Sequence, residues 1–496
     1  MLTELPREDW SPTLAAHLVN RAGFGGTLDE ILATAAMTPG EAVDRLVDFE
    51  AIPDVVEPPA FAAADGADAR PDPRATQGMT REERQEYQRE ERRTEALRII
   101  AARGWWLARM RNTARPLQEK LTLFWHGHFA TSFEKVRFAY PMYLQNTTFR
   151  AHAAGNFEAL VVAVAQDPAM LIYLDNARSN PKQPNENFAR EVMELFSLGE
   201  GNYAEEDIKN AARAFCGWSL QQEAFRFMER PRLRDTGAKT IFGETGAFNG
   251  GDAVRLILKQ PAMAPFICAK LWSFFAYDDP EPEVVNALAA VFVKHQLELK
   301  PVLRAMFRSR AFYSERARRT QIKSPAQWLA GTTRMLQATL PSDEACAGIL
   351  ATLGQELFQP PNVKGWPGGY TWITADTLLK RYNLAGFLVK GGRVMTQGRP
   401  NEALSGGGPL RGQIIKALAT MEPAVDADLA VPASVRGDAD QLVAHLARVL
   451  FQAPLREADQ EAVKTYLAKR VGGPFTNTQI RDLLHILMST PHYQLT

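Results

Sequence analysis

Apolar residues recur three and four positions apart along most of the chain, which is the spacing of amphipathic helices, while the alternating pattern of strands is scarce. The pattern predicts a mainly α protein: a multi-helix globular body with long irregular loops and few or no strands. The predicted helices are two within 12–50, broken at 23–26, and then 80–112, 116–128, 157–166, 185–198, 205–217, 252–259, 262–276, 282–295, 299–308, 322–339 and 343–358.

Shifts in composition predict five segments. N-terminal helices occupy 1–50, and an irregular loop rich in Pro, Ala and Asp follows at 51–79. The main helical body spans 80–391, and a glycine-rich flexible linker at 392–410 joins it to a C-terminal helical unit at 411–496. We therefore expect the principal functional site within the body.

One segment of the body has a counterpart near the C-terminus. Leu303–Tyr313 resembles Leu483–Tyr493, and each follows a helix that begins after a turn rich in Pro and acidic residues. The similarity predicts two related three-helix units, although amphipathic helices also resemble one another by chance. Elsewhere in the body, the polar stretch 228–250 predicts a long loop that could serve as a lid or contact a ligand.

The helix predicted at 185–198 carries the densest set of polar side chains. Asn185 suits its N-cap, and Gly199 suits a left-handed residue just past its end. Glu191 lies at the border of the apolar arc, where partial burial beside a second carboxylate raises a pKa into the range of a general acid. The alternative is a solvated face whose ion pairs stabilise little. The polar arc comprises Glu186, Asn187, Arg190, Glu191, Glu194 and Ser197.

A pair of histidines suggests a metal site. His126 and His128 flank Gly127, and on an extended backbone both imidazoles would project to one side and could hold a divalent metal ion. The alternative is that His126 merely interacts with the C-terminal end of a helix, where the dipole favours a cation. The metal shell would be completed by Glu191, Glu194 or Asp175.

Two polar or aromatic loops could border the same cleft. Asp175 and Asn176 end an apolar stretch shortly before the 185–198 helix, where they either form a turn or face the cleft. Trp366, Tyr370 and Trp372 lie in a loop dense in Gly and Pro, which suits either a platform for sugar rings or packing onto the helical body.

Composition and missing motifs exclude several classes of function. Lys plus Arg (57) equals Asp plus Glu (57), so no overall positive field attracts nucleic acid. Three widely spaced cysteines argue against a disulfide framework and against a cysteine zinc site. We expect no membrane span and no secretory signal, because there is no long apolar run and no basic start before an apolar core. Phosphate-binding glycine loops and the Gly-x-Ser-x-Gly motif are absent, which disfavours nucleotide-dependent and serine-hydrolase chemistry.

Several motifs occur together in a fixed order: His17–Gly25, Phe124–Thr131, Asp167–Leu171, Leu174–Asn176, the 185–199 helix, Phe215–Trp218, Gly237–Thr240 and Pro360–Trp366. As a set they resemble the bacterial domain-of-unknown-function family numbered 1800, over about 12–496. The resemblance implies a predominantly helical protein. It also implies a genomic neighbour from the family numbered 1501, which resembles sulfatases and alkaline phosphatases and is usually exported by the twin-arginine route.

Two positions depart from the family pattern. Arg234 stands where members often carry a His before Asp235, which puts a role of that His in metal binding or proton transfer in doubt. Ala204 stands where many members have Thr or Ser, so this chain lacks a side-chain cap worth about 1 kcal/mol.

Two functions remain open at this point. The first is a hydrolase of a glycan or related polymer, in which Glu191 is the general acid or base, Glu186 or Asp175 is the second carboxylate, and Arg190 orients a carboxylate. The alternative is a non-catalytic scaffold, or a maturation or export partner of the 1501-family neighbour. We expect a cytoplasmic protein, or a periplasmic one if it is exported together with that partner. Substrate binding would involve Asn187, Glu194, Asn176, Trp218, Trp366 and Trp372.

Overall fold

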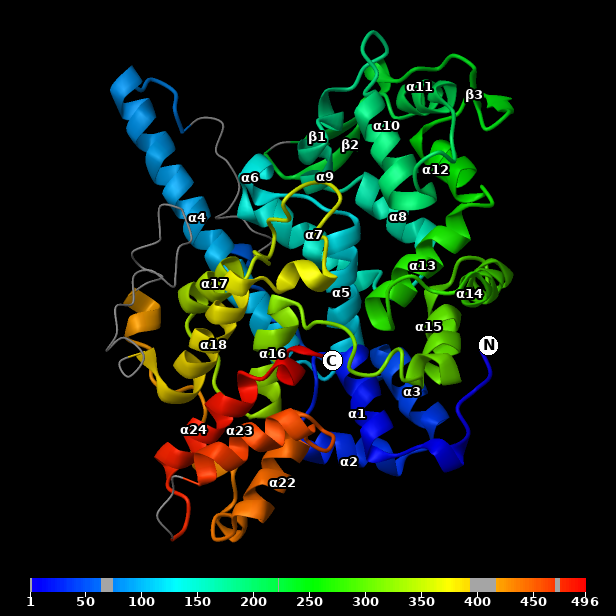
Figure 1. Ribbon diagram of the computed structural model, residues 1–496. Coiled ribbons are helices and arrows are strands. Elements are labelled where there is room, and N and C mark those ends of the chain that lie inside the picture. The colour runs from blue at the N-terminus through cyan, green and yellow to red at the C-terminus, as the bar shows by residue number, and fades with distance from the viewer. Residues whose placement is uncertain (1, 64–74, 222, 393–415, 469–472) are drawn as a thin grey trace.

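The computed structural model describes residues 2–63, 75–221, 223–392, 416–468 and 473–496 (Figure 1). Within these ranges the strands form two antiparallel hairpins, β1 (Trp218–Gln221) with β2 (Arg226–Glu229) and β3 (Lys239–Ile241) with β4 (Glu244–Gly246). The prediction of a mainly α protein is therefore confirmed. The β3–β4 hairpin lies in the stretch 228–250, for which the sequence predicted only a loop.

The helices follow the predicted spacing with a few shifts. Residues 12–50 hold three α-helices instead of two, because Thr38 and Glu41 form a second capping box. Except for Gly392, the predicted linker at 392–410 lies outside the described residues. The α-helices are α1 (Pro12–Arg21), α2 (Leu28–Ala36), α3 (Pro39–Val47), α4 (Arg81–Asn112), α5 (Pro116–His128), α6 (Phe133–Val136), α7 (Ala139–Ala151), α8 (Phe157–Ala165), α9 (Pro168–Tyr173), α10 (Glu186–Met193), α11 (Glu205–Ala214), α12 (Gly250–Leu258), α13 (Met263–Phe275), α14 (Pro282–Lys294), α15 (Leu299–Arg308), α16 (Pro325–Met335), α17 (Asp343–Thr352), α18 (Ala375–Lys390), α21 (Ala427–Ala430), α22 (Ala439–Leu450), α23 (Glu457–Leu467) and α24 (Asn477–Met488).

Helix α5 runs through the middle of the molecule (Figure 1), and every residue from Leu117 to His126 is buried. Leu121 and Trp125 enter one apolar core, which α1, α3, α8 and α10–α15 complete. Leu123 enters a second core, built mainly from α4, α7, α16–α18 and α21–α24. The second core joins the C-terminal helices to α4 and α16–α18.

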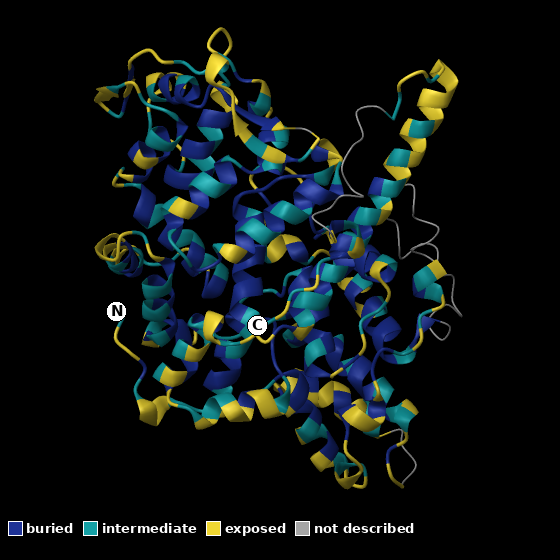
Figure 2. Cartoon of the chain, turned by 180° about the vertical axis from the view of Figure 1, so that it is seen from behind, coloured by how far each residue is buried: buried dark blue, intermediate teal, exposed yellow. Residues whose placement is uncertain are grey.

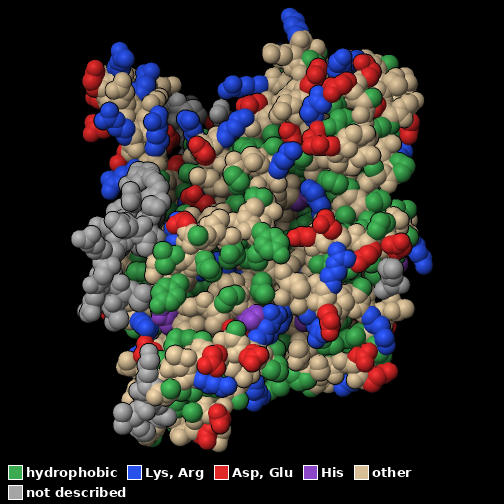
Figure 3. Space-filling view, viewed as in Figure 1, with side chains coloured by type: hydrophobic (Ala, Val, Ile, Leu, Met, Phe, Trp, Pro, Cys, Tyr) green, Lys and Arg blue, Asp and Glu red, His purple; other side chains and the backbone are tan. Residues whose placement is uncertain are grey.

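The N-terminal half of α4 projects from this body (Figure 1), and most of its residues are exposed (Figure 2). Arg and Glu side chains are interspersed on the projecting part (Figure 3), which is the composition of a helix that contacts water on all sides. None of the described helices combines the length and the apolar character that a membrane crossing needs.

The two similar segments end in the same way. The 3₁₀ turn Arg310–Tyr313 follows α15, and the 3₁₀ turn Pro491–Gln494 follows α24. The Ser309 and Thr490 hydroxyls accept from a backbone N–H in the respective turns. Each turn follows three helices, α13–α15 or α22–α24, so the two predicted three-helix units share one order of elements.

A buried carboxylate on α5 ties the centre together. Glu119 is 0% exposed and accepts from Arg150 Nε at 2.6 Å, Arg109 Nη2 at 3.0 Å and Trp106 Nε1 at 3.0 Å. Burial alone would raise the pKa of Glu119, but the two guanidinium groups more than offset burial and hold the pKa below its ordinary value. The carboxylate is therefore charged and satisfied in the core.

Glu119→Gln removes the carboxylate that pairs with the buried Arg150 and the half-buried Arg109, so we expect it to destabilise the protein by about 3–5 kcal/mol. Urea unfolding followed by circular dichroism measures the change. Glu86→Gln, on the exposed part of α4, is the control and should change stability by less than about 0.5 kcal/mol. A Glu119→Gln protein as stable as the control would show that the ion cluster does not hold the core.

Candidate functional site

The helix with the densest polar arc ends in an unusual way. After Met193 the chain continues as a π-helical turn, Glu194–Leu198, in which the Gly199 N–H donates to the Glu194 carbonyl oxygen at 2.9 Å. Gly199 has φ 81°, a left-handed conformation that glycine adopts without strain. The last carbonyls of a helix lack partners within it, so those of Leu195 and Phe196 are free to accept from side chains.

His128 and Lys270 contact these carbonyls. His128 Nε2 lies 3.1 Å from the Phe196 oxygen, which can only accept, so the ring carries its proton on Nε2. Its Nδ1 then accepts from Lys270 Nζ at 3.2 Å, and Lys270 also lies 3.5 Å from the Leu195 oxygen. Burial, together with the Lys270 charge, holds the pKa of His128 well below its ordinary value, and burial lowers the pKa of Lys270 to about 8.

His126 has the opposite arrangement. Its Nε2 accepts from the Phe358 backbone N–H at 3.0 Å, so its proton is on Nδ1. The ring packs against Trp106 and Trp366, with centroids 5.4 Å and 5.3 Å away. Burial lowers the pKa of His126 to about 3.

The premise of the metal hypothesis, an extended backbone at His126 and His128, is wrong. Both residues belong to α5, and positions two apart on a helix point in nearly opposite directions. A metal ion would have to displace the Phe358 N–H from one ring or the Lys270 ammonium from the other. Within the described residues, no three His, Cys, Asp or Glu side chains form a cluster that could hold a metal ion.

The loop at 359–372 is anchored on the end of α5. A Cβ on Gly365 would lie 2.1 Å from the Gly127 carbonyl oxygen, so the two backbones approach as closely as glycine allows. Gly365 also has φ 80°, a conformation that favours glycine. Trp366 is half-buried over α5, and Trp372 is 6% exposed. Tyr370 is 87% exposed, so it is the aromatic ring that this loop presents to solvent.

Glu191 is a carboxylate without a partner. Its side chain is half-buried and makes no hydrogen bond or ion pair with any described residue. Burial raises its pKa, and the charge of Glu194 raises it further, against opposing effects of Lys364 and Arg190. Glu194 accepts a hydrogen bond from the Tyr203 hydroxyl. The structure thus places Glu191 beside Glu194, with Lys364 near enough to affect it.

Other predicted site residues lie elsewhere. Glu186 and Asn187 are exposed at the start of α10. Arg190 forms a two-bond ion pair with Glu205, at 2.9 and 2.8 Å, and does not pair with Glu186. Asp175 is exposed and pairs with Lys135 Nζ at 2.6 Å. Glu186 and Asp175 are therefore less suited than Glu194 to act with Glu191.

Asn176 and Trp218 are buried within the fold. Asn176 is 0% exposed, and neither polar atom of its side chain has a hydrogen-bond partner among the described residues. Trp218 is 4% exposed, with its ring 5.2 Å from that of Phe215 and 5.5 Å from that of Phe227. Trp218 is thus a core residue of the β1–β2 hairpin.

Sequence reasoning missed three polar residues of the site. Lys270 is the only charged residue in the apolar helix α13, which is a signal that could have been used. Lys364 lies inside the quoted Pro360–Trp366 motif, but its partner Glu200, at 3.3 Å, is far away in sequence. Tyr203 gives no local signal, because its contact with Glu194 depends on how the chain turns after Gly199.

Gly365→Ala should lower the free energy of unfolding by at least about 2 kcal/mol more than Gly201→Ala. Both glycines have φ near 80°, but a Cβ on Gly201 meets nothing within 4 Å, whereas one on Gly365 meets the Gly127 oxygen. Urea unfolding followed by circular dichroism measures the difference. Equal effects of the two substitutions would mean that the loop does not press on α5.

Lys270→Met should reduce the pH dependence of stability. The pKa of Lys270 is about 8 when folded and 10.5 ordinarily, so the native state binds fewer protons between these values and its stability rises with pH there. The shift corresponds to about 3 kcal/mol that the methionine protein would not gain between pH 8 and 10.5. Unfolding at several pH values tests this, with the exposed Lys294→Met as control. Identical pH profiles for wild type and Lys270→Met would contradict it.

Comparison with known proteins gives one match. No curated protein and no solved structure matches the chain. The family described as "Protein of unknown function (DUF1800)" matches residues 17–495, nearly the whole chain, and this range contains α5, the π turn and the loop at 359–372. The chain therefore belongs to the DUF1800 family of proteins of unknown function.

Proposed function

We propose that the protein is a hydrolase of a glycan or related polymer, with Glu191 as its general acid. The observation that carries this proposal is the state of Glu191, a half-buried carboxyl with a raised pKa and no partner among the described residues. A carboxyl group that only stabilises a fold is normally paired or hydrogen-bonded when it is partly buried. A carboxyl that donates a proton at neutral pH needs a raised pKa and an unoccupied oxygen.

Glu194 is the second carboxylate in this proposal. It lies three residues after Glu191, a separation that places helical side chains about 5–6 Å apart at Cβ. The Tyr203 hydroxyl donates to it, which fixes its orientation as a base or nucleophile requires. Arg190 is held by Glu205 through two hydrogen bonds, whereas the exposed Lys364 makes one longer bond, to Glu200 at 3.3 Å, so Lys364 is the cation better placed to contact substrate.

The loop at 359–372 supports a polymer substrate. Tyr370 is exposed and Trp366 half-buried on a loop that also carries Lys364. Aromatic rings bind the apolar faces of sugars, and a neighbouring cation suits an acidic or hydroxyl-rich polymer. In this proposal the protein acts in the cytoplasm, unless it is exported with a partner.

The second candidate function is a non-catalytic scaffold, or a maturation or export partner of a sulfatase- or phosphatase-like protein of the family numbered 1501. It is favoured by the hydrogen bonds of His126 and His128, each of which bonds to a backbone group of another segment. Buried hydrogen bonds of this kind fix how helices pack without any substrate. A periplasmic location by co-export belongs with this function.

Reducing-end release from neutral, acidic and sulfated polysaccharides and from peptidoglycan tests the hydrolase proposal. Glu191→Gln should lower kcat by about 100-fold or more, with little change in KM, because the amide cannot donate a proton. The wild-type rate should fall as pH rises through the raised pKa of Glu191, since the acid must be protonated. The exposed Glu283→Gln is the matched control and should keep the wild-type rate.

No release from any of these polymers by the wild type, or full activity of Glu191→Gln, would overturn the hydrolase proposal. Co-purification of the chain with a 1501-family protein, unaffected by Glu191→Gln, would favour the scaffold instead. Both experiments compare the wild type with Glu191→Gln.

A further inference from the structure

A cleft lies where the two three-helix units end, far along the chain from Glu191. The backbone at Ile322 pairs with that at Leu495, and the Lys323 N–H donates to the Gln494 oxygen at 2.8 Å. The cleft beside this pairing has a volume of about 380 Å³. In Figure 3, basic side chains and a histidine lie just below the centre of the face, close to where Figure 1 shows the C-terminal end.

Four cations line this cleft: Arg318, Arg319, Lys323 and Arg456. None of the four forms an ion pair with a described residue. Arg319 donates to the Phe451 carbonyl oxygen at 3.1 Å, which satisfies one N–H but neutralises no charge. Glu315, which is exposed, contributes a side-chain carboxylate to the lining, and Thr496, whose backbone oxygen accepts from Arg21, also lines the cleft. Nearby Asp459 pairs with His492 at 2.6 Å.

Lys323 is the most deeply buried of the four cations. It is 6% exposed, and its Nζ makes no hydrogen bond with a described residue but lies 3.9 Å from the Tyr493 ring centroid. Burial, with the neighbouring Arg319 and Arg381 charges, lowers the pKa of Lys323 to about 7. An ammonium group buried among other cations is costly unless an anion binds it.

We propose that this cleft binds a phosphate or sulfate group, either free or as a monoester. The guanidinium groups can each donate two parallel N–H bonds to such an oxyanion, and Lys323 supplies a point charge from the floor of the cleft. The proposal is independent of the hydrolase activity, because the cleft shares no residue with the Glu191 site.

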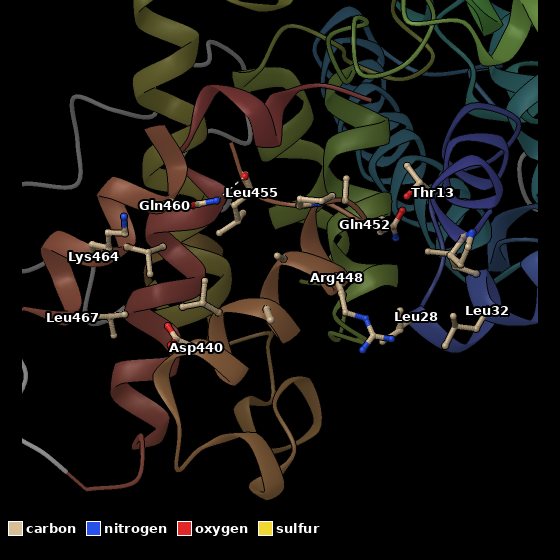
Figure 4. A pocket seen from close by; sticks show the side chains of 18 residues that line it. Thr13, Leu28, Leu32, Asp440, Arg448, Gln452, Leu455, Gln460, Lys464 and Leu467 are labelled. Carbon is tan, nitrogen blue, oxygen red and sulfur yellow. Dashed lines mark hydrogen bonds between the residues drawn. The ribbon is translucent and has the colours of Figure 1, made fainter. Parts of the chain in front are cut away.

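A neighbouring apolar groove offers space for the alkyl chain of a phosphate ester, which a free anion lacks. An open apolar groove of about 580 Å³ lies between α1–α2 and α22–α23, and Leu28, Leu32, Leu455 and Leu467 line it (Figure 4). Thr13, Gln452, Ala453 and Pro454 border both the groove and the cationic cleft. The alkyl part of a phosphate ester could therefore lie in the groove while its head group occupies the cleft.

Isothermal titration of the full chain with inorganic phosphate, sulfate and octyl phosphate tests the proposal. The wild type should bind at least one of them saturably, and more weakly as salt rises. Lys323→Met should weaken binding by about tenfold or more, and Arg456→Gln by several-fold. Arg456 is exposed, so its variant remains informative if Lys323→Met does not fold. The exposed Arg230→Gln is the charge-matched control and should bind as the wild type does.

Failure of the wild type to bind all three probes would overturn the proposal. So would wild-type affinity in both cleft variants, or a loss in Arg230→Gln as large as theirs. Tighter binding of octyl phosphate than of inorganic phosphate would assign the site to an ester whose chain uses the groove. Equal affinities would assign it to the free anion.

Discussion

The close approach of Gly127 and Gly365 fixes the position of the loop at 359–372, and the candidate site depends on that loop. Any side chain at Gly365 would overlap the Gly127 oxygen, so only glycine permits the crossing. The contact seats Trp366 against His126, and the chain at Phe358 donates to the same imidazole. Lys364 is carried on this loop to the neighbourhood of Glu191.

The two histidines of α5 show how the surrounding segments are held together. One ring accepts from the backbone before the loop, and the other donates to the backbone of the π turn. Because both rings are neutral and buried, they bind helix ends to one another without adding charge to the core. A buried charge cluster is formed instead by Glu119, about two turns earlier on α5, together with Arg109 of α4 and Arg150 of α7.

Much of this arrangement follows from local pattern. Helical periodicity predicts most of the helices, and Asn185 caps α10 as its position before the apolar arc predicts. Periodicity also places Glu191 correctly at the edge of the apolar arc, half-buried. The third N-terminal helix, α3, was not predicted, although Thr38 and Glu41 have the spacing of a capping box.

The rest depends on contacts between distant segments. The pairing of Arg190 with Glu205, of Glu194 with Tyr203 and of His126 with Phe358 requires the folded chain, and no spacing along the sequence encodes it. The extended backbone assumed for His126 and His128 was wrong for a local reason, since a His-x-His pair converges on a strand and diverges on a helix. Closeness in sequence to Glu191 does not reveal that Glu186 and Asp175 are exposed, or that Asp175 pairs with Lys135.

Both imidazoles of α5 are neutral and hydrogen-bonded to the backbone, and the two rings adopt opposite tautomers. Nitrogen-15 NMR of histidine-labelled protein measures this directly, because the ring nitrogen shifts distinguish both tautomers from the charged ring. We expect a proton on Nδ1 of His126 and on Nε2 of His128, with no titration of either ring near the ordinary pKa of 6.5. Titration of either ring near that value, or the same tautomer in both, would contradict the account.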